Sequence, residues 1–241
     1  PAGMAGPFTI TLDSQDNGLS GAGGSKQDSK TLTLNGVAAP VITSGASGSV
    51  AENAATSTVV YTATATDAES DALTYALTGT DAAAFTIDTA GAVRLLSAAD
   101  FETKSSYSIT VNAKDATHTT TKAVTINVTD VNEAPSNIAL SASSVAENTS
   151  TASALNIGNL SSTDPDTGNT FTYSVVGGAD QASFQVSGAA LQFKPGTTLD
   201  YEAKSSYAVT VRSTDQGGQT FDKAFTVTLT NVNDKPELTT T

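Results

Sequence analysis

The chain has no cysteine and no tryptophan among its 241 residues, and it has a single histidine, His118. Without cysteine it can form no disulfide, and thiol catalysis and zinc sites built from Cys and His are excluded. Any histidine-based catalysis would depend on His118, which lies in the polar run Ala-Thr-His-Thr-Thr-Thr and is accompanied by no Gly-x-Ser-x-Gly motif. We therefore predict that the chain is not an enzyme.

Positive charge is also scarce. Lys and Arg total 11 against 24 Asp and Glu, which gives a formal net charge of -13. This balance argues against a nucleic-acid or anionic-membrane partner and makes cations the natural counterpart. No apolar run approaches the roughly 18 residues that a membrane span needs, so we expect no direct membrane contact.

Short runs of alternating apolar and polar residues are typical of half-buried strands. Examples are Val59, Tyr61 and Ala63, then Tyr107, Ile109 and Val111, then Phe225, Val227 and Leu229. Gly, Asp, Asn and Pro separate these runs, as in turns. The pattern predicts an all-β fold of antiparallel sandwiches.

The chain contains an internal repeat of about 100 residues. Val-Ala-Glu-Asn at 50–53 recurs at 145–148, and Asp-Phe-Glu at 100–102 recurs as Asp-Tyr-Glu at 200–202. Asp-Val-Asn-Glu-Ala-Pro, ending at Pro135, returns as Asn-Val-Asn-Asp-Lys-Pro, ending at Pro236. We predict two homologous units, residues 45–134 and 135–236, with a tail at 237–241.

Residues 1–44 resemble the last part of a third copy. Phe8-Thr-Ile-Thr-Leu12 aligns with Tyr107-Ser-Ile-Thr-Val111, and residues 31–34 would form the final strand after a Gly/Ser-rich loop over 17–30. A lone two-stranded hairpin is marginal in water. We therefore interpret residues 1–44 as the C-terminal hairpin of a truncated preceding repeat plus a linker, cut from a longer array or from an interrupted unit.

Carboxylates concentrate at the predicted strand ends. Glu52, Glu102, Asp130 and Glu133 would lie at the exit end of the first unit, and Asp164, Asp166 and Asp215 at the entry end of the second. If the units stack end to end, these seven acids meet in one crevice. Like charges about 4 Å apart repel by roughly 4 kcal/mol at an effective dielectric near 20, so cations must fill it. Oxygen ligands without His or Cys favour calcium, with magnesium as the less suitable alternative.

The ordered motifs Ala-Glu-Asn, Asp-Pro-Asp, Asp-Phe-Glu or Asp-Tyr-Glu, Thr-Asp-Gln-Gly and Asp-Val-Asn-Glu-Ala-Pro resemble the cadherin repeat, particularly the cadherin-like repeats of large bacterial surface adhesins. The resemblance covers about residues 45–236. It implies tandem seven-stranded Greek-key sandwiches of the immunoglobulin-like, cadherin type, with two or three Ca²⁺ ions at the junction. The implied ligands are Glu52, Glu102, Asp130, the carbonyl of Val131, Asn132, Glu133, Asp164, Asp166, Asp215 and a carbonyl of Asn169.

The sequence departs from the family pattern in three places. Glu133-Ala134 stands where the family usually has Asp-Asn, which leaves the count between two and three ions. Upstream, Asp67, Glu69 and Asp115 face a linker without acids, so we expect weak or no binding there. Downstream, Glu147, Glu202, Asn233 and Asp234 form a half site in which Asn231 replaces the first acid.

Plainer interpretations stay open. Glu52 and Glu147 could be solvated acids at strand ends, and Asp164 and Asp166 could simply form turns. We predict a calcium-rigidified extracellular module of a secreted bacterial adhesin that supports adhesion and biofilm formation. Its partners would be neighbouring repeats and another adhesin or a surface glycan. The alternative is a carbohydrate-binding or accessory module of an exported polysaccharide-degrading enzyme, although aromatics at 6% leave few for a sugar platform.

Overall fold

The computed structural model describes residues 8–15, 27–34 and 36–233. The chain divides into two units, Pro1–Asp130 and Val131–Thr241. The regular secondary structure of their described parts is almost entirely β-strand, as predicted. Ahead of the first sandwich, β1 (Phe8–Gln15) and β2 (Gln27–Leu34) pair antiparallel, with Phe8 opposite Leu34. The predicted loop over 17–30 is too long at its C-terminal side, because residues 27–30 belong to β2.

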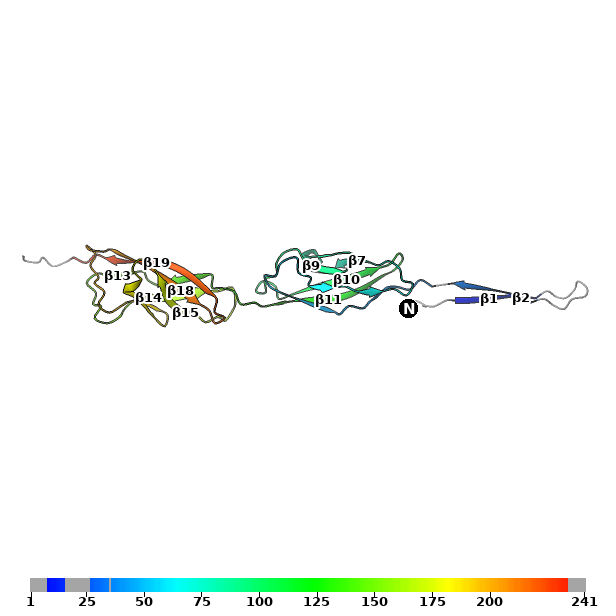
Figure 1. The fold of residues 1–241 in the computed structure, drawn as a ribbon, viewed down its shortest axis with the longest axis horizontal. Helices are drawn as coiled ribbons and strands as arrows, with labels where there is room; N and C mark the ends of the chain where they lie inside the picture. Colours follow the sequence, from blue (N-terminus) through cyan, green and yellow to red (C-terminus); the bar gives the residue numbers. More distant parts are fainter. Residues whose placement is uncertain (1–7, 16–26, 35, 234–241) are drawn as a thin grey trace, which may run out of the picture. The chain divides into compact units, whose positions relative to one another are not determined.

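The first sandwich has two layers of strands (Figure 1). One sheet has the order β4-β11-β10-β7, with β4 parallel to β11 and the other pairs antiparallel. The facing layer contains the pair β3-β6 and the sheet β5-β9-β8, with the short 3-10 helix η1 (Ala82–Ala84) before β8. The bounds are β3 (Val41–Ile42), β4 (Ser47–Ala51), β5 (Tyr61–Thr62), β6 (Ala65–Thr66), β7 (Thr74–Thr78), β8 (Phe85–Ile87), β9 (Ala92–Leu95), β10 (Ser106–Lys114) and β11 (Thr119–Thr129).

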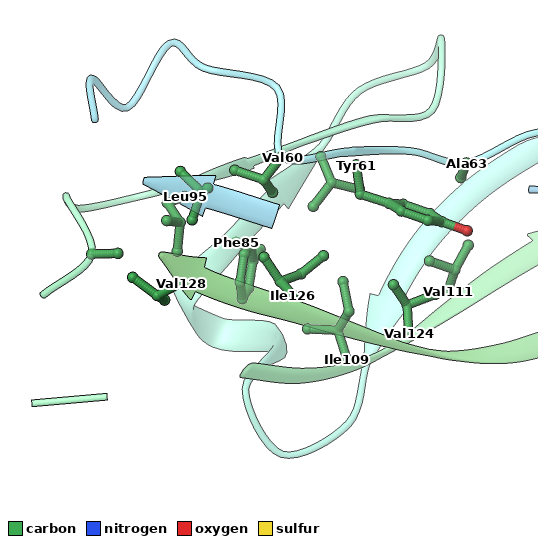
Figure 2. Packing of buried hydrophobic residues seen from close by; sticks show 13 residues of the cluster. Val60, Tyr61, Ala63, Phe85, Leu95, Ile109, Val111, Val124, Ile126 and Val128 are labelled. Carbon is green, nitrogen blue, oxygen red and sulfur yellow. The ribbon is translucent and has the colours of Figure 1, made fainter. Parts of the chain in front are cut away.

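The core of this sandwich follows the alternation of β10 and β11. Ile109, Val111, Val124 and Ile126 are all at most 1% exposed, whereas the residues between them point outward. Figure 2 shows these side chains facing Val60, Tyr61, Phe85 and Leu95 of the other layer. Burying each such side chain contributes about 1.5–3 kcal/mol, so this layer contact is the main source of the unit's stability.

The second sandwich repeats this order. One sheet is β13-β19-β18-β15, with β13 parallel to β19, and the other is β12-β14-β17-β16. Phe184 and Phe193 stack at 4.9 Å in its core, with Tyr207 edge-on to both. The bounds are β12 (Asn137–Leu140), β13 (Ser144–Ala146), β14 (Leu155–Thr163), β15 (Thr172–Gly177), the 3-10 helix η2 (Gln181–Ser183), β16 (Phe184–Ser187), β17 (Ala190–Phe193), β18 (Ser206–Thr214) and β19 (Thr220–Thr230).

The strand pairing also bears on where the first repeat begins. β3 pairs with β6, with Val41 opposite Thr66, and so belongs to the first sandwich. The predicted start at residue 45 leaves this strand out. The reason is that β3 has only two residues, too few to show an alternating pattern in the sequence.

Candidate metal centre

Three acids meet where the first sandwich ends. Glu52, Glu102 and Asp130 each have a carboxylate oxygen within 4.8 Å of the others. The pairing of β4 with β11 explains part of this arrangement, because parallel strands in register end side by side. Ala51 is opposite Thr129, and the Glu52 backbone N donates to the Thr129 carbonyl at 3.0 Å. The acids that directly follow the two strands, Glu52 and Asp130, are therefore brought together.

The third acid, Glu102, is positioned by the buried side chain of Glu52, which is 3% exposed. The Oε2 atom of Glu52 accepts a hydrogen bond of 2.9 Å from the backbone N of Phe101, the residue directly before Glu102. The backbone N of Asn53 donates to the Ala99 carbonyl at 2.9 Å, and Asn53 adopts the left-handed conformation with a φ of 57°. These bonds hold the Asp-Phe-Glu turn against the strand ends.

The second unit carries the other predicted ligands at its entry end. Asp164 and Asp166 follow β14, and Asp215 follows β18. The Oδ2 of Asp166 accepts a hydrogen bond of 2.7 Å from the backbone N of Glu133, and the Oδ2 of Asp215 accepts one of 2.9 Å from the Nδ2 of Asn132. The segment that opens the unit, with Val131 at its start, is thus bonded to two of the predicted acids.

Several polar atoms at this end are buried without a partner. Asp164 Oδ2, Asp166 Oδ1 and Asn169 Nδ2 are inaccessible to solvent and accept or donate no hydrogen bond. A buried carboxylate oxygen left in this way costs free energy unless a cation neutralises it. The atoms available here to bind an ion are carboxylate, amide and backbone oxygens, which are the ligands that calcium takes. The residues present therefore fit a calcium ion.

Asp215 is held as a carboxylate. Burial opposes its ionisation, but hydrogen bonds from the Asn132 side chain and from the backbone N–H groups of Gln219, Gly218 and Gly217 outweigh this, and the pKa of Asp215 lies below its usual value. Gly217 also makes room for Asn132. A Cβ at position 217 would lie 2.4 Å from the Cγ and Oδ1 of Asn132.

The entry end of the first unit differs from that of the second. Asp115 corresponds to Asp215, but Thr117 stands where the second unit has Gly217. The Oδ1 of Asp115 accepts hydrogen bonds from the backbone N–H groups of His118 and Thr117, which lower the pKa of Asp115. Glu69 accepts a hydrogen bond of 3.2 Å from the Ala38 backbone N. The Oδ2 atoms of Asp67 and Asp115 are buried without a hydrogen-bond partner.

The exit end of the second unit contains a candidate ligand that sequence reasoning missed. Asp200 joins Glu147 and Glu202, with one carboxylate oxygen of each lying within 4.8 Å of the others. The repeated Asp-x-Glu motif was the available signal, since Asp200 opens it. Of the predicted members of this half site, Asp234 lies outside the described residues.

Comparison with known proteins identifies the repeat. The cadherin domain family matches residues 46–129 and 142–230. The chain belongs to this family. Mouse protocadherin Fat 2 is 29% identical over 74% of the chain, and human protocadherin Fat 1 is 30% identical over 78%. In both cases the chain spans only 4% of the relative's length.

Solved cadherin structures share the fold. Human protocadherin-24 EC1-2 has a TM-score of 0.65 at 20% identity, covering 82% of this chain and 100% of that one. Drosophila N-cadherin EC1-4 has a TM-score of 0.61 at 23% identity, and the match covers 96% of this chain and 59% of that one. The tandem cadherin-type sandwich predicted from the sequence is therefore confirmed.

The family assignment gives a coarse functional frame. Cadherin domains are extracellular repeats typical of adhesion proteins, occur beside further repeats, and are known to bind calcium. The named relatives are animal protocadherins, so the cadherin part of the predicted resemblance is confirmed and its bacterial adhesin part stays a prediction. Within the described ranges, no helix is both long and apolar enough to cross a membrane.

Proposed function

We propose that the two cadherin repeats form a calcium-stiffened extracellular module of a surface adhesin. One observation carries the proposal. Asp130 closes the acidic cluster of the first repeat, and within the next three residues the chain is hydrogen-bonded to Asp166 and Asp215 of the second. The acids of both repeats are therefore attached to one short segment.

Covalent geometry limits how far these acids can separate. Consecutive Cα atoms are about 3.8 Å apart, so Asp130 and Glu133 can be at most about 11 Å from one another. Each calcium ion takes six to eight oxygen ligands, so two or three ions need more oxygens than the three carboxylates of the first repeat supply. We propose that two or three ions share Glu52, Glu102, Asp130, Val131, Asn132, Glu133, Asp164, Asp166, Asn169 and Asp215.

The mechanical consequence follows from electrostatics. Without an ion, acids held on both sides of a three-residue segment repel one another and favour many joint angles. An ion reverses the sign of this interaction and adds ligand bonds to both repeats. Dissociation constants of about 10⁻⁴ to 10⁻³ M suit an extracellular module, which would be stiff in millimolar calcium and flexible after chelation.

The parent protein, on this proposal, is a secreted bacterial adhesin in which such units extend or present a contact surface. This part rests on the likeness of the sequence motifs to bacterial cadherin-like repeats. The proposed partners are neighbouring repeats and another adhesin or a surface glycan. The sugar-binding alternative gains no support, because Tyr201, 37% exposed, is the one aromatic among the large exposed hydrophobic side chains of the described residues.

Small-angle X-ray scattering of the full chain tests the stiff joint. In millimolar calcium we expect a narrow distribution of intramolecular distances, and after chelation a broader one. Asp166→Ala should scatter in calcium as the parent does in chelator, with both repeats still folded by circular dichroism. Asp222→Ala is the matched control, because it removes one charge from the same repeat at the Arg212 ion pair. Identical profiles for parent and Asp166→Ala in calcium would overturn the proposal.

A further inference from the structure

The exit ends of the two repeats differ at one position. Asp130 follows β11 in the first repeat, and Asn231 follows β19 in the second. The Nδ2 of Asn231 donates a hydrogen bond of 2.8 Å to the Oε1 of Glu202. Because an ionised carboxylate only accepts hydrogen bonds, the atom of Asn231 that faces Glu202 must be the amide nitrogen. In the first repeat the same place holds a carboxylate close to Glu102.

This amide bond joins a network of hydrogen bonds around Glu147. Glu147 is buried, with 3% of its surface exposed. Its Oε2 accepts a hydrogen bond of 2.7 Å from the backbone N of Tyr201, and its Oε1 accepts one of 2.8 Å from the backbone N of Val232. Glu147 thus connects the acidic turn to the segment that leaves β19, and Asn231 connects that segment back to Glu202. Within the turn, Glu202 is held by Asn231 of the strand exit, and Tyr201 by the carboxylate of Glu147.

We propose that Asn231 sets the calcium affinity of the second repeat's exit end. Its amide takes the place of an ion on Glu202, so this end keeps its shape without calcium and binds calcium more weakly than the end of the first repeat. An incoming ion must displace the amide from Glu202 and gains only a neutral oxygen from Asn231. The inference rests on the proposed function, because it compares two ends of the same calcium chemistry.

Asp200 adds a third carboxylate to the second repeat's exit end, so this end should still bind calcium. In the first repeat, the corresponding Asp100 accepts hydrogen bonds from Thr103, 2.9 Å from the backbone N and 2.8 Å from Oγ1. Ala203 has no hydroxyl, and its backbone N donates to Asp200 Oδ1 at 2.9 Å. Asp200 therefore reaches the cluster with Glu147 and Glu202, and we expect weak binding rather than none.

Terbium luminescence can report on this end separately. Tyr201 adjoins Glu202 and can transfer excitation to bound Tb³⁺, whereas the first repeat has Phe101 at the matching position. The difference between the full chain and its Tyr201→Phe variant isolates the second exit end, and calcium competition gives its affinity. We expect Asn231→Asp to tighten calcium binding about tenfold, because ligand charge sets affinity in such sites. The reciprocal Asp130→Asn should weaken binding at the first repeat.

Melting in chelator provides a second readout. Asn231→Asp should melt lower than the parent without calcium and higher with it, because the new carboxylate repels Glu202 until an ion binds. Asn231→Ala should melt lower in chelator and gain no affinity. Unchanged Tyr201-dependent affinity in a folded Asn231→Asp chain would overturn this inference. If neither the parent nor Asp130→Asn responds to calcium at the first repeat, the proposed function itself fails.

Discussion

Thermal unfolding with and without calcium is the most direct test of the acidic cluster in the first repeat. The perturbation is removal of calcium by a chelator from the full chain. Glu52, Glu102 and Asp130 have oxygens within 4.8 Å of one another. At that distance each pair of unit charges repels by about 0.9 kcal/mol in water and about 3.5 kcal/mol at an effective dielectric near 20.

The three pairs together give about 3–10 kcal/mol of repulsion to be relieved. Exposure of Glu102 and Asp130 places the true value toward the lower limit, and Glu52 is buried. The stabilisation that is measured depends on the calcium concentration relative to the dissociation constant. At 100 times its dissociation constant, an ion adds about 2.7 kcal/mol to the free energy of unfolding. For a repeat of this size, 1 kcal/mol shifts the melting temperature by about 4–8 °C, so we expect a rise of about 10–20 °C.

Differential scanning calorimetry provides the assay. Scans in 10 mM calcium, in chelator and in chelator with added sodium chloride separate specific binding from charge screening. Asp130→Asn should lose most of the calcium-dependent shift, whereas Asp71→Asn, which removes an exposed acid outside the cluster, should keep it. Superimposable scans in calcium and chelator, or a full shift in Asp130→Asn, would refute the reasoning.

Three further outcomes follow from single contacts. Gly217→Ala should weaken calcium binding several-fold in isothermal titration calorimetry, because its Cβ would displace Asn132; Gly45→Ala, where a Cβ meets nothing within 4 Å, should bind as the parent does. Lys104 and Lys204 lower the pKa of Asp81 and Asp180, chiefly through side-chain hydrogen bonds. Since the folded pKa of each aspartate is then below its unfolded pKa, the stabilisation from the two aspartates is complete above about pH 5 and is lost as the pH falls through the folded pKa. In urea unfolding with chelator, the free energy of unfolding of Asp81→Asn should therefore fall less steeply with decreasing pH than that of the parent. An unchanged fall would contradict this reasoning. Ile126→Ala should lower the free energy of unfolding of the first repeat by about 2–5 kcal/mol in urea titrations, and a loss below 1 kcal/mol would contradict the packing.

The sequence predicted the long strands because their burial alternates without interruption. In β10 and β11 every second residue is less exposed than its neighbours, and the same pairing recurs in β18 and β19. The β5 region was predicted correctly at Tyr61 and Ala63, which are buried, but not at Val59. Val59 was expected to point inward but is 43% exposed, whereas Val60 and Tyr61 are both buried. Consecutive buried residues beside a two-residue strand give no period for a sequence pattern to detect.

β14 shows no regular alternation in the sequence, for a related reason. Its register shifts between Asn156 and Gly158, and Ile157 and Gly158 are both buried. A bulge of this kind adds a residue to one strand, so the alternation reverses partway. Gly158 permits the bulge to pack closely, because a Cβ there would lie 2.7 Å from the Ala142 carbonyl oxygen. The exact length of this strand therefore depends on tertiary packing that the local sequence does not encode.

At the acidic ends of the two repeats, the position of each motif was predictable from the sequence, but the hydrogen bonds and ligands that each end offers were not. In both repeats a glutamate backbone N bonds to the last strand, Glu52 to Thr129 and Glu147 to Thr230, so the same scaffold places the same acidic turn. What each end can bind depends on the residues around it. Thr117 replaces a glycine, Ala203 replaces a threonine, and Asn231 replaces an aspartate. Each exchange accompanies a different local hydrogen bond, and on the proposed function these exchanges would give the two repeats different responses to calcium.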